Sequence, residues 1–380
     1  ILSKKSWTFC GVLSFFIGFF TYAILYSMLY KNVLKPILFR FDPEMVHNHF
    51  VWFGEFAGKS RVLKRLVSLL YGYKGKDISK TVDGLTYQTP FLLSAGFDYN
   101  GRLLNILPEI SFGGEEVGSV TARPSEGNPK PRLIRLPKSR SLIVNKGLRN
   151  DGVDKIIERL SHFAKATRDK KNFVVGISIA RTNDEKASDT EEGVKDYVYS
   201  FKRLNEENIG DYYTLNISCP NAFGGETFAN PVLLQKLLAK ISEIKCSKPV
   251  YIKMPINLEW QKFDELLKVA EKFEMIKGVV IGNLNKNYED LDYRDEAPES
   301  YCGGLSGKPC SELSNELIKK TKAVYGNRFT IIGCGGIMSV EGMVKKFEAG
   351  SDLIQLITGM IYNGPGFIKE LANEYSKKYE

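Results

Sequence analysis

The 380-residue sequence has few of the residues that build metal centres or disulfide frameworks. Its six cysteines are scattered, no two of them form a CxxC motif, and the three histidines lie far from any cysteine. Zinc and iron–sulfur sites need such residues in close groups, so we expect no metal cofactor. The scattered thiols are also unlike the closely spaced cysteines of a small secreted protein.

Two patterns of nucleotide recognition are missing as well. No run of arginines alternates with aromatic residues, although the formal net charge is +9, so we expect no nucleic-acid partner. The positive charge fits either anionic surfaces or substrates, or simply a solvated, lysine-rich exterior. No GxGxxG motif follows an early strand, so the dinucleotide fingerprint is absent. With 43% apolar and 26% charged residues, the composition is that of a globular protein.

A long uncharged segment lies near the beginning of the sequence. Residues 6–30 are 25 positions without a charged side chain. As a helix they would extend about 37 Å at about 1.5 Å per residue, enough for the roughly 30 Å hydrocarbon core of a bilayer. Trp7 at one end and Tyr30 at the other fit interfacial positions. We therefore expect a single-pass N-terminal transmembrane anchor, residues 1–31; the alternative is a cleaved signal peptide.

Two short amphipathic helices are expected next, in a neck formed by residues 32–76. Asp42 is a good N-cap and Pro43 a good first helical residue for the first of them. The second, from Ser60, sets apolar side chains against arginines and lysines. Such a pair could pack on the domain that follows, or it could lie in a membrane interface with its basic face toward lipid headgroups.

Beyond residue 76, short β-rich runs alternate with amphipathic helical stretches. The eight runs are 91–95, 116–120, 173–179, 213–217, 250–253, 278–281, 329–333 and 353–356. Eight such β/α units over about 290 residues are typical of a TIM (β/α)8 barrel rather than of a doubly wound sheet. We therefore predict an α/β fold in which residues 77–380 form the barrel, preceded by the transmembrane helix and the helical neck.

Polar residues and glycine pairs fall where the predicted strands end, which is where barrel enzymes place their active sites. Asn216 and Cys219 follow the fourth strand, Lys253 ends the fifth and Asn283 follows the sixth. GCGGI (333–337) follows the seventh strand and TGM (358–360) the eighth. Glycine-rich corners at these two strands commonly hold a phosphate, and no nucleotide motif competes, so flavin mononucleotide (FMN) is the expected cofactor.

Several blocks in this order resemble the dihydroorotate dehydrogenases, flavoenzymes of pyrimidine biosynthesis. The blocks are AGFDYNG (95–101), GSVTARPSEGNPKPR (118–132), NISCPN (216–221), IKMP (252–255), GGLSGKP (303–309), IIGCGGI (331–337) and QLITG (355–359). The uncharged segment and the helical neck resemble the membrane-associated, quinone-dependent class (class 2). The resemblance implies oxidation of dihydroorotate to orotate by FMN, with ubiquinone or menaquinone as final acceptor and the neck as the quinone tunnel.

The resemblance also assigns roles to individual positions. Cys219 would be the base that takes the C5 proton of dihydroorotate, although members of the quinone class usually have serine there. A cysteine needs less activation than a serine hydroxyl for this task. The substrate would be held by Asn145, Asn216, Asn221 and Asn283. The flavin and its phosphate would be held by Ala95, Gly96, Ser119, Asn216, Lys253, Gly304, Gly307, Gly335, Gly336, Thr358 and Gly359.

The sequence departs from the family pattern around the substrate and the flavin ring. Tyr99 replaces a lysine, Ser178 an asparagine, Leu284 a threonine and Ile357 a tyrosine, and the IVNKGLRN segment places Asn145 one residue out of register. Three interpretations remain open: a divergent quinone-linked dihydroorotate dehydrogenase, a flavin oxidoreductase on the same scaffold with another substrate, and a degenerate membrane-anchored homologue. The anchor favours a lipid-membrane location, in a mitochondrial inner membrane or a bacterial cytoplasmic membrane.

Overall fold

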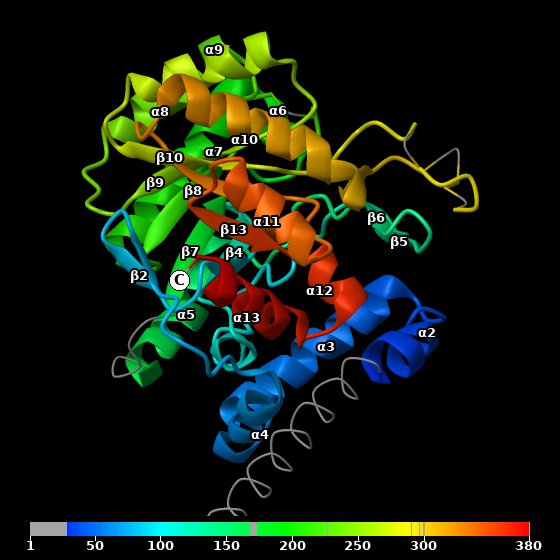
Figure 1. Ribbon diagram of the computed structural model, residues 1–380. Coiled ribbons are helices and arrows are strands. Elements are labelled where there is room, and N and C mark those ends of the chain that lie inside the picture. Colours follow the sequence, from blue (N-terminus) through cyan, green and yellow to red (C-terminus); the bar gives the residue numbers. More distant parts are fainter. Residues whose placement is uncertain are drawn as a thin grey trace, which may run out of the picture.

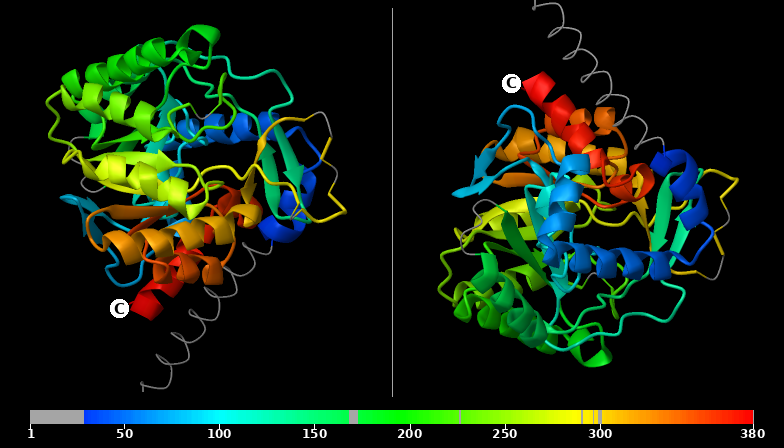
Figure 2. Two further views of the ribbon diagram at one scale, coloured as in Figure 1. Left: turned by 90° about the horizontal axis from the view of Figure 1, so that it is seen from above. Right: turned by 90° about the horizontal axis from the view of Figure 1, so that it is seen from below.

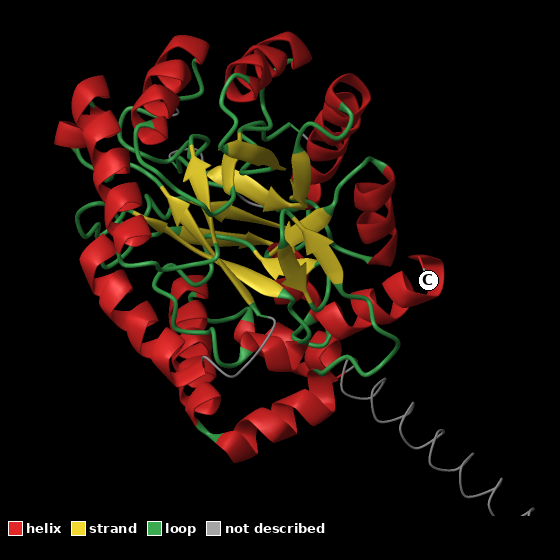
Figure 3. Ribbon diagram, turned by 90° about the vertical axis from the view of Figure 1, so that its left-hand side faces the viewer, coloured by secondary structure: helices red, strands yellow, loops and turns green. Residues whose placement is uncertain are grey.

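The computed structural model describes residues 29–379, apart from 168–172, 226, 290, 296 and 299–300. Its centre is a closed barrel of eight parallel strands (Figures 1 and 3). In order around the barrel these are β3 (Phe91–Leu93), β4 (Gly114–Val120), β7 (Val174–Ile179), β8 (Tyr212–Asn216), β9 (Val250–Met254), β10 (Ile276–Ile281), β12 (Thr330–Cys334) and β13 (Leu353–Leu356). Each matches one of the eight predicted runs, so the predicted TIM barrel is confirmed.

Helices surround the barrel in the positions that the alternation predicts (Figure 3). They are α5 (Val153–Thr167), α6 (Glu185–Ser188), α7 (Thr190–Glu206), α8 (Pro231–Ser242), α9 (Trp260–Glu271), α10 (Ser311–Tyr325), α11 (Val340–Glu348), α12 (Thr358–Asn363) and α13 (Phe367–Tyr379). Their starts follow local rules. Asn230 caps α8 ahead of a proline at the first helical position, and Asp189 caps α7 through two backbone N–H groups.

One end of the barrel is closed by a hairpin that the sequence did not reveal. β1 (Lys80–Val82) and β2 (Leu85–Tyr87) form this antiparallel pair. Tyr87 is fully buried with Tyr212 and Tyr251 in one apolar cluster, and the Tyr251 hydroxyl donates to Asp83 Oδ2 at 2.7 Å. Because the hairpin fills the end from which the strands begin, the opposite end, where the strands finish, is the open one.

A small antiparallel sheet stands beside the open end. It consists of β5 (Leu133–Leu136), β6 (Ser141–Val144) and β11 (Gly304–Gly307), in the order β11–β6–β5. Two short 3-10 turns, η2 (Leu107–Ile110) and η3 (Lys308–Cys310), lie in neighbouring loops. Segments distant in sequence thereby meet at the mouth of the barrel, because β6 and β11 are paired from Val144 with Gly304 to Ser141 with Gly307.

The helical neck packs closely on the loops at this end (Figure 2). It contains a π-helical turn η1 (Tyr30–Leu34), α2 (Lys35–Leu38), α3 (Pro43–Lys59) and α4 (Arg61–Tyr71), and the predicted caps Asp42 and Ser60 are confirmed. A Cβ on Gly54 would lie 2.5 Å from Leu103 Cδ2, so the helix comes closer to the barrel loop than a larger residue allows. The buried apolar residues of α3 share one core cluster with β3 and β13.

The prediction of a membrane-spanning anchor is corrected by the structure. No helix in the part of the chain that is described is long and apolar enough to cross a membrane. The longest of these helices have 17 residues, about 26 Å at 1.5 Å per residue, which is shorter than the roughly 30 Å of a hydrocarbon core. This finding overturns the predicted single-span location in a mitochondrial inner or bacterial cytoplasmic membrane. Residues 1–28 of the predicted anchor lie outside the described residues.

Candidate functional site

A cavity of about 470 Å³ lies between the open end of the barrel and α3. Its walls combine a polar side, from the ends of the barrel strands, with an apolar side, from α3, α4 and the loops they contact. The predicted site residues that contribute to its walls are Ala95, Gly96, Ser119, Asn216, Cys219, Asn221, Lys253, Asn283 and Thr358. The structure therefore brings together residues from six parts of the sequence that were predicted separately.

The asparagines at this polar side are joined through hydroxyl groups. Asn216, the last residue of β8, donates from Nδ2 to Ser119 Oγ at 2.8 Å, and its Oδ1 accepts a hydrogen bond from Ser218 Oγ at 3.2 Å. Asn283 Nδ2 in turn donates to the same Ser218 oxygen at 2.7 Å. Ser119 is also bonded to Ser178 Oγ at 2.8 Å, at the position where the family has asparagine. This network fixes the directions in which Asn216 and Asn283 present their amides to the cavity.

Cys219 lies half-buried on the loop after β8, three residues beyond Asn216. The loop is tied to the small sheet, because Asn221 Nδ2 donates to the backbone oxygen of Val144 at 2.7 Å. The Asn221 backbone oxygen accepts from Asn128 Nδ2 at 2.9 Å. Cys219 is thus held over the cavity from both ends of a short, hydrogen-bonded loop.

Lys253 enters the cavity from the inside of the barrel. Its Nζ donates to Ser94 Oγ at 3.1 Å and lies 4.0 Å from Glu116 Oε1, and both members of this ion pair are buried. The other carboxylate oxygen of Glu116 accepts from Thr214 and Gln355, at 2.8 and 2.9 Å. A carboxylate held this way fixes the ammonium group at the bottom of the site, where it can face a negative charge.

The two predicted glycine corners pack against each other beside Thr358. Gly335 and Gly336 have φ of 92° and 78°, a region that favours glycine. A Cβ on Gly336 would lie 2.3 Å from Ser311 Cα, and one on Gly359 would lie 2.1 Å from the Ile337 oxygen. Gly304, Gly307, Gly335, Gly336 and Gly359 do not themselves contribute to the cavity walls, whereas Thr358 does, bonded to Ser306 Oγ at 2.9 Å.

Asn145 does not contribute to the cavity walls. Strand β6 ends at Val144, which does contribute, and Asn145 Oδ1 accepts from Asn128 Nδ2 at 2.6 Å instead. Because neighbouring residues of an extended chain point to opposite sides, a shift of one position exchanges the side chain that faces the cavity. The register difference noted in the sequence therefore replaces an amide by an isopropyl group at this wall.

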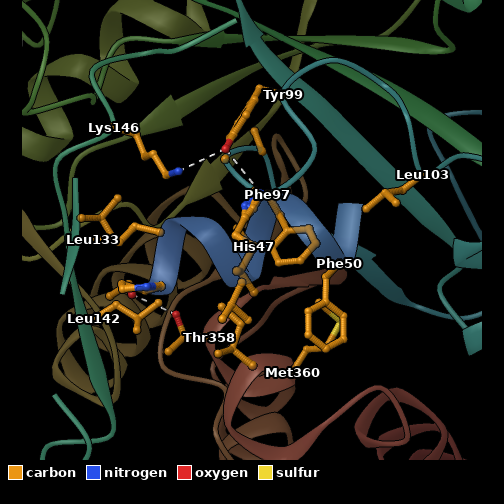
Figure 4. A pocket seen from close by; sticks show the side chains of 18 of the residues that line it. His47, Phe50, Phe97, Tyr99, Leu103, Leu133, Leu142, Lys146, Thr358 and Met360 are labelled. Carbon is orange, nitrogen blue, oxygen red and sulfur yellow. Dashed lines mark hydrogen bonds between the residues drawn. The ribbon is translucent and has the colours of Figure 1, made fainter. Parts of the chain in front are cut away.

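Sequence reasoning missed a cluster of charged and polar residues at the apolar side. Figure 4 shows the Tyr99 hydroxyl between Lys146 Nζ, at 3.1 Å, and His47 Nε2, at 3.4 Å. The His47 ring is stacked on Phe97 with centroids 4.8 Å apart. Burial, together with the nearby Lys146 ammonium, lowers the pKa of His47 to about 3, so its imidazole is neutral near pH 7.

Glu44, in the first turn of α3, is the anion of this cluster. Its Oε1 lies 3.2 Å from Arg132, Lys146 and Arg149, and its side chain is 5% exposed. Burial alone would raise the pKa of Glu44, but the neighbouring cations outweigh it and the pKa is lowered. The paired residues are 88 to 105 positions apart in the sequence, so no local sequence pattern predicts these ion pairs.

Comparison with known proteins identifies the relatives of this chain. The family model described as dihydroorotate dehydrogenase matches residues 77–378. A protein of Christiangramia forsetii named dihydroorotate dehydrogenase (quinone) is 33% identical over 92% of this chain and 99% of its own length. A protein of the same name from a Synechococcus strain is 32% identical over 90% and 91%. A crystal structure of DHODH from Eimeria tenella in complex with ferulenol has a TM-score of 0.75 at 24% identity, over 92% and 93% of the two chains, and so shares the fold.

Proposed function

Since the chain belongs to the dihydroorotate dehydrogenase family, we propose that it oxidises dihydroorotate to orotate and passes the electrons through a flavin to a quinone, in pyrimidine biosynthesis. The observation that carries this proposal is that the cavity between the barrel and α3 has two unlike sides. The polar side suits a pyrimidine ring and a flavin. The apolar side suits the ring and tail of a ubiquinone or menaquinone. A one-sided polar pocket would support only the first half of the reaction.

On the polar side, the amides and the thiol divide the work on the substrate. Asn216, Asn221 and Asn283 would hold the carbonyl and N–H groups of the dihydroorotate ring. A bound flavin would supply the hydride acceptor for C6 of that ring. Cys219 Sγ would accept the proton from C5, so that the C–H bond on that carbon breaks as the ring double bond forms. The hydrogen bond from Asn221 to the Val144 oxygen supports this role because it holds the loop that carries Cys219 at the cavity wall.

The residues present fit FMN. The paired glycine corners are packed so closely against Ser311 and Ile337 that neither Gly336 nor Gly359 has room for a Cβ, and they would supply backbone N–H groups for a phosphate, with the Thr358 hydroxyl at the cavity wall beside them. Lys253, held by Glu116, would face the edge of the flavin ring at which negative charge collects on reduction. FMN rather than a dinucleotide is proposed because the sequence has no dinucleotide fingerprint.

On the apolar side, residues 32–76 would form the part of the protein through which quinone arrives. The helices α3 and α4 expose large apolar side chains, namely Phe50, Trp52, Phe53, Phe56, Val62, Leu66 and Leu69. An exposed apolar face of this size marks an interaction surface. Quinones with long tails dissolve in bilayers, so we propose that this face rests on a lipid surface as a peripheral contact, with residues 77–380 as the catalytic barrel.

An anaerobic titration of the purified protein with dihydroorotate tests the proposal. Bleaching of the flavin absorbance, followed by its recovery on adding decylubiquinone but not fumarate, is the expected result. A bound flavin that dihydroorotate leaves oxidised would contradict the substrate assignment. A second candidate is a flavin oxidoreductase that acts on an uncharged substrate. It is favoured by Tyr99, which occupies the position of a family lysine and so removes a positive charge. Bleaching by dihydrouracil but not by dihydroorotate would select that candidate.

A further inference from the structure

Three polar side chains joined by hydrogen bonds, Lys146, Tyr99 and His47, lie within the apolar side of the cavity. Tyr99 reaches it from the loop after β3, Lys146 from the loop after β6 and His47 from α3, while Phe50 and Met360 line the wall around them (Figure 4). An ammonium group has no lone pair, so Lys146 can only donate to the Tyr99 oxygen. The proton of the Tyr99 hydroxyl is therefore left for another acceptor. His47 Nε2, at a long 3.4 Å, accepts that proton when the imidazole is protonated on Nδ1.

Lys146 is placed to serve as an acid. The groups that face it are Glu44 from α3, Arg132 from the chain before β5, Arg149 from its own loop, and the Tyr99 hydroxyl. Burial, together with the two guanidinium groups, lowers the pKa of Lys146 to about 8 against the attraction of Glu44. Lys146 is thus protonated near pH 7, yet it gives up its proton more readily than an exposed lysine.

We propose that the Tyr99 hydroxyl, replenished by Lys146, donates a proton to the oxygen of the quinone head group as the quinone is reduced. This proposal rests on the proposed function. Conversion of a quinone to a quinol requires two electrons and two protons, of which the reduced flavin supplies both electrons and one proton. The other proton leaves Tyr99 Oη and forms the O–H bond of the quinol, while a proton from Lys146 Nζ restores the Tyr99 hydroxyl. Lys146 then regains a proton from solvent beside the partly exposed Arg149.

Three other basic residues that line the cavity, His47, Arg135 and Lys253, are not placed for this step. His47 is neutral because of its low pKa, so it can receive a hydrogen bond but holds no spare proton. Arg135 donates to backbone oxygens after α2 and lies over an aromatic ring. A guanidinium also keeps its proton at any relevant pH. Lys253 lies inside the barrel with Glu116, at the polar side.

The experiment isolates the quinone half of the reaction. The flavin of the whole protein is reduced with light and a deazaflavin, so that the result does not depend on dihydroorotate, and is then mixed rapidly with decylubiquinone between pH 6 and 9.5. For the wild type, the reoxidation rate is expected to be level at low pH and to fall about tenfold per pH unit above pH 8. Tyr99→Phe is expected to lower the rate 100-fold or more at pH 7. Lys146→Met and Lys146→Arg are expected to lower it similarly and to remove the fall above pH 8.

Arg149→Met is the matched control, because Arg149 and Lys146 contact Glu44 at the same distance, whereas Lys146 also donates the hydrogen bond to Tyr99. It is expected to keep the rate at pH 7 and to move the fall to higher pH, since removing a nearby cation raises the pKa of Lys146. Side-chain NMR of 13C-lysine is expected to show the same upward shift. Wild-type reoxidation rates in Tyr99→Phe would overturn the proposal. So would an equal loss in Tyr99→Phe of quinone reduction and of flavin reduction by dihydroorotate. Failure of the proposed function would appear separately, as a wild type that dihydroorotate does not reduce.

Discussion

The three cations around Glu44 make this residue the most sensitive ionic contact between α3 and the barrel loops. We expect Glu44→Gln to destabilise the protein strongly. Each pair at 3.2 Å corresponds to a gross attraction of about 5 kcal/mol at an effective dielectric constant near 20. Desolvation of the carboxylate and repulsion among the cations offset most of this sum. The expected loss of unfolding free energy in Glu44→Gln is therefore the cost of leaving the buried cations without their anion, about 3–5 kcal/mol.

Glu55 offers a matched control on the same helix. It also pairs with two cations, Lys59 and Arg102, but its side chain is 30% exposed. Solvent screening limits such pairs to about 1 kcal/mol, so Glu55→Gln should be nearly neutral. The assay is urea unfolding of both variants and the wild type at pH 7.5, with the free energy extrapolated to zero denaturant. Equal stabilities of the two variants would refute the argument that burial, rather than ion-pair number, decides the contribution.

Three further predictions concern the cofactor, the base and acid stability. Cys219→Ala is expected to retain the flavin but to lose its reduction by dihydroorotate, measured as absorbance bleaching; a retained reduction rate would exclude Cys219 as the base. Gly336→Ala is expected to lose flavin on gel filtration, because its Cβ would lie 2.3 Å from Ser311 Cα, whereas Gly326→Ala, also at positive φ but in open space, should keep it; equal retention would contradict the cradle. Because the folded-state pKa of His47 lies below its unfolded value, the stability that its neutral form contributes is lost as pH falls from about 6.5 toward 3. Between pH 7.5 and 5.5 the wild type should therefore lose about 1 kcal/mol more than His47→Gln in urea unfolding, and parallel losses would argue against a buried neutral imidazole.

The barrel could be predicted from the sequence because its signals are local. Each strand is a short apolar run between helical stretches, and the caps Asp42 and Ser60 act within three residues of themselves. The hairpin that closes the barrel has no comparable signal, since its three-residue strands are shorter than the runs that periodicity can identify. Its position depends on distant contacts such as that of Asp83 with Tyr251.

The candidate site was predictable where its residues stand at strand ends, and not where distant contacts place them. Asn216, Cys219 and Lys253 stand at the ends of strands, and the geometry of a barrel brings such ends together whatever their spacing in sequence. Asn145 lies at the end of a strand whose register is set by pairing with β11, which the sequence does not specify. The substitution at Tyr99 was visible, but its hydrogen bond to Lys146 joins residues 47 positions apart and emerges only from the fold.

The close approach of α3 to the barrel has a consequence for recombinant fragments. The match to the family model begins at residue 77, which would be the natural first residue of a shortened expression fragment. Such a fragment would uncover the loop surface against which Gly54 packs, including Leu103 and its apolar neighbours. We expect a fragment that begins at 77 to aggregate, whereas one that begins at residue 29 retains the helix that covers this surface.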